Sequence, residues 1–231
     1  MGIAIFGGSF DPIHNGHIRY AEEALKLGFI TDVYFVPAFV SPHKVHLSAT
    51  ETTASAEDRL NMVTEAVSGY DNFKVLDIEI RRGGKSFTID TLEGLVNFLS
   101  EEDLYLLMGE DAFADLPKWH RYKDILNICD LIVMARGRES TSISDKNAYG
   151  KALADKVVGG EAVANSSEFW YDENSEVIIT SYGSRAILLT NNLLEVSSTE
   201  IREMAVGGVD FSHLVPKEVF DYIIVNKLYT K

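Results

Sequence analysis

The chain has 231 residues, of which 46% are hydrophobic and 24% are charged. This balance is typical of a folded globular protein, and at about 150 residues per domain the length predicts one domain, residues 1–231, that carries an insertion. Lys and Arg number 21 against 35 Asp and Glu, and the net charge of −14 argues against a protein that coats nucleic acid or lies on an anionic membrane.

The cysteine count and the amino terminus indicate the compartment. A single cysteine, Cys129, excludes an intramolecular disulfide and a cysteine-rich zinc site. It follows the apolar run that begins at Ile125, which favours a buried thiol in a reducing environment. The first residues lack the features of a signal peptide, and no apolar run approaches the length of a membrane span. We therefore expect a cytoplasmic protein.

Short apolar runs alternate with longer helical patterns along most of the chain, which is typical of an α/β protein with a parallel sheet. We expect strands at residues 2–6, 32–36, 73–80, 104–108, 130–135, 177–180 and 186–190. The pattern predicts a Rossmann-like, doubly wound parallel sheet with a C-terminal helical segment.

Helices are expected between these strands. They begin near Gly16, after Ser55, at residue 88 (ending near residue 99), after Ser197 and at Pro216. Residues 55–58 and 197–200 have the form of a capping box, which marks a helix start. Gly207 and Gly208 are expected to end the helix that follows Ser197.

Residues 137–176 break the alternation. They are rich in Ser, Asn, Gly and acidic residues, but Tyr149, Phe169, Trp170 and Tyr171 make them too aromatic for a disordered linker. We expect an insertion that packs on the main domain. A peripheral role is favoured over a regulatory or oligomer-forming one, and a homo-oligomer is left open.

The first predicted strand leads directly into Gly7-Gly8-Ser9-Phe10-Asp11-Pro12-Ile13-His14-Asn15-Gly16-His17. In a doubly wound sheet this loop lies at the carboxyl edge, where ligands bind. Paired glycines allow close approach of the backbone, and the new helix offers free N–H groups to an anion. His14 and His17 are three residues apart, so both imidazoles can face one phosphate and stabilise its charge. Neither of the common phosphate-loop patterns, G-x-x-x-x-G-K-[ST] or G-x-G-x-x-G, is present.

Zinc is the competing explanation, because four of the six histidines, His14, His17, His43 and His46, lie near the amino terminus. Against it, this H-x-x-H lacks the Glu of H-E-x-x-H, and no cysteine lies nearby. We therefore favour an anion site and expect no metal held by the protein itself.

The glycine-rich segment resembles the signature G-G-[ST]-F-D-P-x-H-x-G-H of the H-x-G-H nucleotidyltransferases, and residues 196–202, Val-Ser-Ser-Thr-Glu-Ile-Arg, resemble their second motif, [IV]-S-[SA]-T-x-I-R. Residues 42–44, 86–91, 109–111 and 116–120 resemble the P-P-H-K, S-Y-T-x-x-T and G-x-D…L-P-x-W segments of nicotinate mononucleotide adenylyltransferases. The resemblance covers residues 1–136 and 184–231 and leaves the insertion outside.

The resemblance implies an enzyme of NAD synthesis that transfers the adenylyl group of ATP to nicotinate mononucleotide and releases pyrophosphate. Direct in-line attack needs positioning and charge neutralisation more than acid–base chemistry. Mg²⁺ is expected on ATP, held chiefly by phosphate oxygens and water. Two alternatives stay open: an adenylyltransferase of the same superfamily that prefers another substrate, such as nicotinamide mononucleotide, and, in a different class, a nucleotide-binding regulator without activity.

The resemblance also implies the site residues. Catalytic phosphate contacts fall to His14, His17, Lys44 and Arg202. ATP binding falls to Gly7, Gly8, Ser9, Phe10, Gly16, Gly109, Asp111, Arg136, Ser197, Ser198 and Thr199. The residues expected to bind the pyridine nucleotide are Asp11, Thr88, Ile89 and Trp119. Trp119 would stack on the pyridine ring. The sequence departs from the family pattern at Ser41, Phe87 and Gly137, which concerns the geometry of loops.

Overall fold

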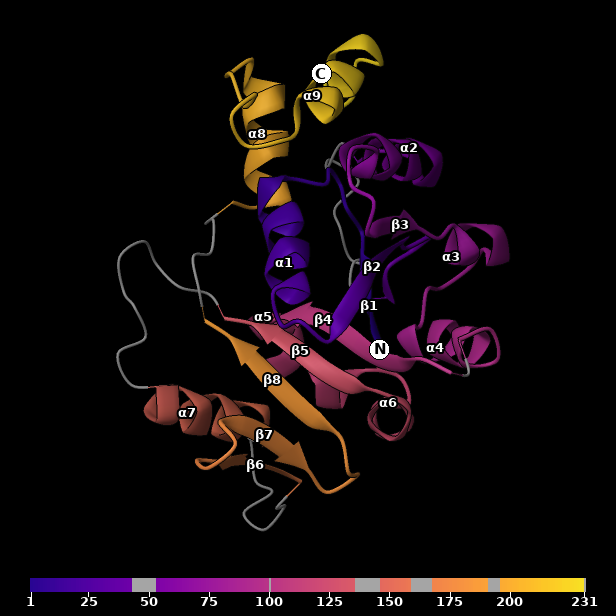
Figure 1. Cartoon of the computed structure of the whole chain (residues 1–231). Helices are drawn as coiled ribbons and strands as arrows, with labels where there is room; N and C mark the ends of the chain where they lie inside the picture. Colours follow the sequence, from indigo (N-terminus) through magenta and orange to yellow (C-terminus); the bar gives the residue numbers. More distant parts are fainter. Residues whose placement is uncertain (43–52, 100, 136–145, 159–167, 191–195, 231) are drawn as a thin grey trace.

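The computed structural model describes residues 1–42, 53–99, 101–135, 146–158, 168–190 and 196–230. In these residues a single eight-stranded sheet has the strand order β3-β2-β1-β4-β5-β8-β7-β6 (Figure 1). The strands are β1 (Gly2–Gly8), β2 (Ile30–Pro37), β3 (Phe73–Val75), β4 (Asp103–Gly109), β5 (Asp130–Met134), β6 (Phe169–Asp172), β7 (Val177–Thr180) and β8 (Arg185–Leu189).

Helices connect most of these strands. They are α1 (Asn15–Leu25), α2 (Ala56–Val67), α3 (Ile78–Arg82), α4 (Thr88–Val96), α5 (Glu110–Ala114), α6 (Tyr122–Ile128), α7 (Lys146–Val158), α8 (Ser198–Gly207) and α9 (Lys217–Val225), with a short 3₁₀ turn at Leu116–Lys118. No helix of the described residues is long and apolar enough to cross a membrane.

The pairing confirms the predicted Rossmann-like α/β fold and adds one exception. Strand β1 is parallel to β2 and β4, and the pairs β2–β3, β4–β5 and β5–β8 are also parallel. At the far edge, β7 is antiparallel to both β8 and β6. The strand order reverses between β1 and β4, so their carboxyl ends form the crevice in which such sheets bind ligands.

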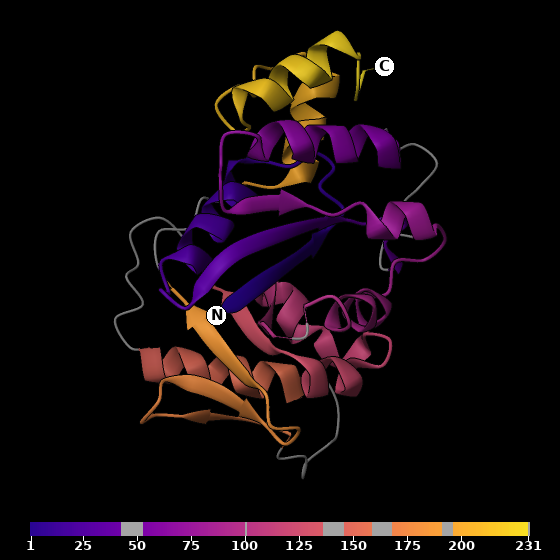
Figure 2. The same cartoon turned by 45° about the vertical axis from the view of Figure 1, so that its right-hand side comes forward.

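Alternating residues of the strands supply two hydrophobic cores, one on each face of the sheet. From β1, Ala4 and Phe6 pack against residues of α1, α2, α8 and α9, whereas Ile3 and Ile5 pack against α4, α5, α6 and α7. This is the period of two expected of a strand that is buried on both faces. In Figure 2, α9 (yellow) lies beside α2, the helix that follows β2.

The helix boundaries follow the predicted caps. The Ser55 hydroxyl accepts a hydrogen bond from the Asp58 N–H, and the Ser197 hydroxyl accepts one from the Glu200 N–H. Gly208 ends α8 with a φ of 68°, which glycine adopts at low cost. Cys129 is buried as expected, and burial raises the pKa of its thiol to about 12.

The strand predicted at residues 73–80 is wrong in its second half. The ladder ends where the Leu76 N–H donates to Phe35 O, and the Arg81 N–H donates to Asp77 O in the helix α3. Val75 packs against one core, and Leu76 and Ile78 pack against the other. The alternation of Leu76, Ile78 and Ile80 looks like a strand although the chain turns into α3 at Asp77. The helix predicted at residues 88–99 ends earlier, at Val96.

Residues 137–176 contain two elements that the sequence analysis did not anticipate. Helix α7 packs against α5, and β6 extends the sheet beyond β7 (Figure 1). The Tyr149 hydroxyl and the Lys156 ammonium both reach Glu110, at 2.7 Å and 3.2 Å. The segment is thus joined to the main sheet by strand pairing and to α5 by polar contacts.

Candidate active site

The loop after β1 places the two motif histidines against each other. His14 is the N-cap of α1, and its ring stacks on that of His17 with centroids 3.6 Å apart. The backbone N–H of His14 donates to Nδ1 of His17 over 3.2 Å. Because Nδ1 accepts this hydrogen bond, the proton of a neutral His17 ring lies on Nε2. The two imidazoles therefore lie side by side at the start of α1, as expected from their spacing of three residues.

His14 is the more deeply placed of the pair. Its side chain is 7% exposed, and burial lowers its pKa to about 4. At neutral pH it is therefore an uncharged imidazole with one N–H to donate. Gly16 lies so close that a Cβ there would stand 3.0 Å from Nδ1 of His14 and 2.9 Å from Val196 Cγ1. Glycine at this position makes room for the ring.

The second motif meets the first at the start of α8. The Ser198 hydroxyl donates to Pro12 O at 2.9 Å, and Nη1 of Arg202 donates to Asp11 O at 2.8 Å. Nη2 of Arg202 reaches the Thr199 hydroxyl at 3.4 Å. The starts of α1 and α8 thus lie near the same loop, and two helix starts of this kind favour an anion.

A cavity of about 500 Å³ opens at the carboxyl ends of β1 and β4. It brings together six of the predicted site residues, namely Gly7, Gly8, Ser9, Thr88, Gly109 and Trp119. A Cβ on Gly8 would stand 3.0 Å from the ring of Phe10, so a larger residue there would require this buried ring to shift by a few tenths of an ångström. The cavity is large enough for a mononucleotide, and its aromatic wall suits a flat ring.

Two polar residues that line the cavity were not assigned a site role in the sequence analysis. Glu79 is buried in the cavity wall, burial raises its pKa, and it accepts a hydrogen bond from the Thr91 hydroxyl at 2.5 Å. Ser86 accepts from the Phe39 N–H at 2.9 Å. Glu79 lies on α3, where the sequence analysis predicted a strand, and Ser86 lies just before α4.

Other predicted residues lie away from the cavity surface. Phe10 and Ile89 are buried in the two cores, and Asp111 is exposed on α5. Ile89 can offer only its backbone N–H, in the first turn of α4. Lys44 and Arg136 fall outside the described residues, as do His43 and His46 of the zinc alternative. Within the described ranges, no three His, Cys, Asp or Glu side chains are grouped to hold a metal ion.

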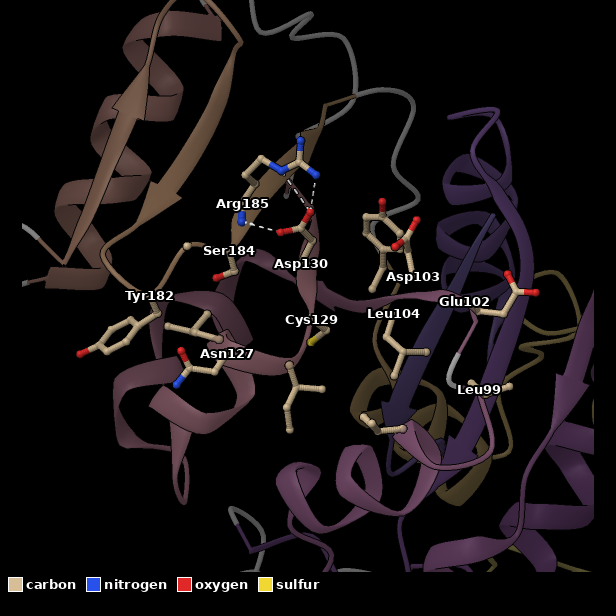
Figure 3. Close-up of a pocket in the computed structure, with 15 residues that line it drawn as sticks. Leu99, Glu102, Asp103, Leu104, Asn127, Cys129, Asp130, Tyr182, Ser184 and Arg185 are labelled. Carbon is tan, nitrogen blue, oxygen red and sulfur yellow. Dashed lines mark hydrogen bonds and ion pairs between the residues drawn. The ribbon is translucent and has the colours of Figure 1, made fainter.

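A second cavity, of about 480 Å³, lies at the opposite edge of the sheet, where β4, β5 and β8 begin (Figure 3). Its central charges pair with each other: Nη2 of Arg185 is 2.6 Å from Asp130 Oδ2, and the Arg185 N–H donates to Oδ1 at 2.7 Å. No residue of the two motifs lines it. Among the described residues, those of the two motifs therefore lie at the carboxyl edge and not around this second cavity.

Known proteins are similar to this chain in sequence and in fold. The family model described as cytidylyltransferase-like matches residues 5–204. The probable nicotinate-nucleotide adenylyltransferase of Geotalea uraniireducens is 35% identical over 229 residues, which cover 99% of this chain and 98% of that protein. The chain belongs to the nicotinate-nucleotide adenylyltransferase family. Another member, from Citrifermentans bemidjiense, is 36% identical over 230 residues, 99% of this chain and 98% of its own.

A solved structure of the same family name has the same fold. The nicotinic acid mononucleotide adenylyltransferase of Plasmodium falciparum, complexed with NaAD, superposes with a TM-score of 0.67 at 18% identity and covers 99% of this chain and 97% of its own. The alignments with the adenylyltransferase relatives extend over nearly the whole chain. They therefore include residues 137–176, beyond the segments that carry the sequence motifs.

Proposed function

We propose that this chain transfers the adenylyl group of ATP to nicotinate mononucleotide, giving nicotinate adenine dinucleotide and pyrophosphate. The observation that carries the proposal is the meeting of the two motifs, through the Ser198–Pro12 and Arg202–Asp11 hydrogen bonds, in a member of the adenylyltransferase family. The paired imidazoles and two helix starts lie at the carboxyl edge, next to a cavity of mononucleotide size.

The nitrogen donors of the loop suit the phosphates of ATP. His17 would donate to the α-phosphate as negative charge grows on it during in-line attack, and His14 and Lys44 would hold neighbouring oxygens. The start of α8, at Ser197 to Thr199, would add backbone N–H groups. Arg202 would supply charge from behind the loop, because one arm of its guanidinium is already bound to Asp11 O.

The cavity would take the pyridine nucleotide. Trp119 would stack on the ring, and the Thr88 hydroxyl with the Ile89 N–H, at the start of α4, would bind its carboxylate. Gly109 and Asp111, where β4 passes into α5, would meet a ribose, because a carboxylate accepts from two hydroxyls. Arg136 would border the adenylate.

Mg²⁺ would arrive bound to ATP. The donors around the two helix starts are imidazoles, hydroxyls and a guanidinium, which suit phosphate oxygens and not a hard cation. The ion would therefore keep phosphate oxygens and water as ligands and neutralise the departing pyrophosphate.

The test is pyrophosphate release from ATP and Mg²⁺ with either nicotinate mononucleotide or its amide. We expect turnover with the acid to exceed that with the amide. Turnover with neither would refute the activity, and preference for the amide would correct the substrate. The variant His17→Ala should keep the fold and lose roughly a hundredfold or more in kcat. Near-normal turnover in that variant would refute the role given to His17.

A further inference from the structure

The loop between β1 and α1 is held from behind by side chains of distant elements. Arg59, from α2, is buried, and its Nη1 donates to Ser9 O at 2.6 Å. Its Nη2 donates to Phe39 O, after β2, at 3.0 Å. One planar guanidinium therefore ties the loop after β1 to the loop after β2.

The Asp11 side chain is buried and is held by hydrogen bonds to two distant residues. Its Oδ1 accepts from the Tyr229 hydroxyl at 2.7 Å and from the Ala54 N–H at 3.0 Å. Asp11 is 4% exposed and Tyr229 2%. Burial and the nearby Asp11 carboxylate raise the pKa of Tyr229, so the phenol keeps its proton and remains the donor.

The conformation held in this way is one that the chain does not adopt freely. Phe10, between Ser9 and Asp11, has a φ of 47°, in the left-handed region that a bulky side chain rarely occupies. Its buried ring lies edge-on against the ring of His17, with centroids 5.0 Å apart. A shift of the loop would thus move the surface on which His17 rests.

We propose that Tyr229, acting through Asp11, and Arg59 are positioning residues for adenylyl transfer: they hold the Ser9–Asp11 loop so that His17 is presented to the phosphates. The inference rests on the proposed function. It gives Asp11 a buried anchoring role in place of the direct substrate contact expected from the family pattern. It also assigns roles to two residues that lie outside every motif of the sequence analysis.

Charge supports the same conclusion. Arg59 and Arg202 are both buried, and Asp11 is the carboxylate that lies between them and Tyr229. Two guanidinium groups therefore lie directly behind the loop, with the Asp11 carboxylate close to them. In a poorly solvated setting such a cluster attracts the phosphates more strongly than exposed side chains do.

The decisive variant is Tyr229→Phe, with Tyr222→Phe as its matched control. Tyr222 lies on α9, and its hydroxyl also donates to a carboxylate, Asp58 Oδ1, at 3.1 Å, but its hydrogen bonds within the described residues do not reach the Ser9–Asp11 loop. We expect kcat/KM for Tyr229→Phe to fall about tenfold, measured well below the melting temperature, because the loop loses an anchor on a charged group. Tyr222→Phe should stay within about twofold of the unchanged chain.

A purely structural role predicts another result. Tyr229→Phe would then lower the melting temperature and leave kcat/KM within twofold, which would overturn the proposal. Arg59→Lys is the second variant, because an ammonium keeps the charge but cannot bridge the carbonyls of Ser9 and Phe39 as a rigid fork. Its kcat/KM should fall as well, and it decides the matter if Tyr229→Phe does not fold.

The affinity for α,β-methylene ATP, which cannot be cleaved at the reacting bond, separates this proposal from the proposed function. If the unchanged chain makes no dinucleotide, the function is refuted, and the loop is then tested by binding alone. Tyr229→Phe should bind the analogue more weakly than Tyr222→Phe does. Equal affinities in the two variants would overturn the positioning role.

Discussion

Replacing Gly16 by alanine tests how tightly the histidine pair is packed. Alanine is favoured over glycine inside a helix by about 1 kcal/mol, so the change would stabilise α1 if there were room. The new Cβ would stand 2.9 Å from Val196 Cγ1 and 3.0 Å from Nδ1 of His14, both well inside normal contact. Relief requires a displacement of several tenths of an ångström in a buried ring, and overpacking of this kind costs about 1–3 kcal/mol.

The control is Gly94→Ala, on the exposed side of α4, where a Cβ meets nothing within 4 Å. Urea unfolding should show Gly94→Ala stabilised and Gly16→Ala destabilised, with the two free energies of unfolding about 2 kcal/mol apart. Because the displaced ring is that of His14, adenylyl transfer by Gly16→Ala should also fall about tenfold. If Gly16→Ala is as stable and as active as Gly94→Ala, the packing argument is refuted.

Three further outcomes are expected. Since burial lowers the pKa of His14 from 6.5 to about 4, the unfolded chain binds a proton between these values that the folded chain does not, and stability should fall by about 2 kcal/mol from pH 7 to pH 5. Urea unfolding at both pH values checks this, and an equal loss in His14→Asn would contradict it. Trp119→Ala should raise KM for nicotinate mononucleotide about tenfold through lost stacking and leave KM for ATP nearly unchanged, whereas equal rises in steady-state kinetics would argue against stacking. Cys129 should resist thiol reagents in the folded chain at pH 8 and react after unfolding in guanidinium, and rapid labelling of the folded chain would contradict its burial.

The sequence predicted best where local chemistry decides the structure. The paired glycines and the histidines three residues apart indicated a strand, a loop and a helix start, and β1 and α1 occur there. The serine caps at Ser55 and Ser197 depend only on residues three positions away, so both helix starts were confirmed.

Prediction failed where two elements share one apolar pattern. Leu76, Ile78 and Ile80 alternate as a strand does, and Asp77, a residue type common in turns, is a local signal against a continuous strand. In the segment 137–176, Tyr149, Leu153 and Val157 are spaced at one helical turn and could have predicted α7. The aromatic run at residues 169–171 has the composition of a strand and could have predicted β6.

The anchoring of the loop could not be found from the sequence at all. Arg59 lies on an amphipathic helix and Tyr229 near a helical segment at the other end of the chain, where each looks like an ordinary polar residue. Their partners are set by how α2 and the residues after α9 pack on the sheet. Only the three-dimensional arrangement shows that both reach the same loop.

The hydrogen bond between Tyr229 and Asp11 joins residues 218 positions apart. During synthesis the glycine-rich loop leaves the ribosome 218 residues before its anchor does. A nascent chain that has released β1, α1 and most of the sheet still lacks this contact and, while α8 is inside the tunnel, the contacts of Ser198 and Arg202 as well. The loop can therefore be fully anchored only after Tyr229 has left the ribosome, when these distant segments of the chain can first meet.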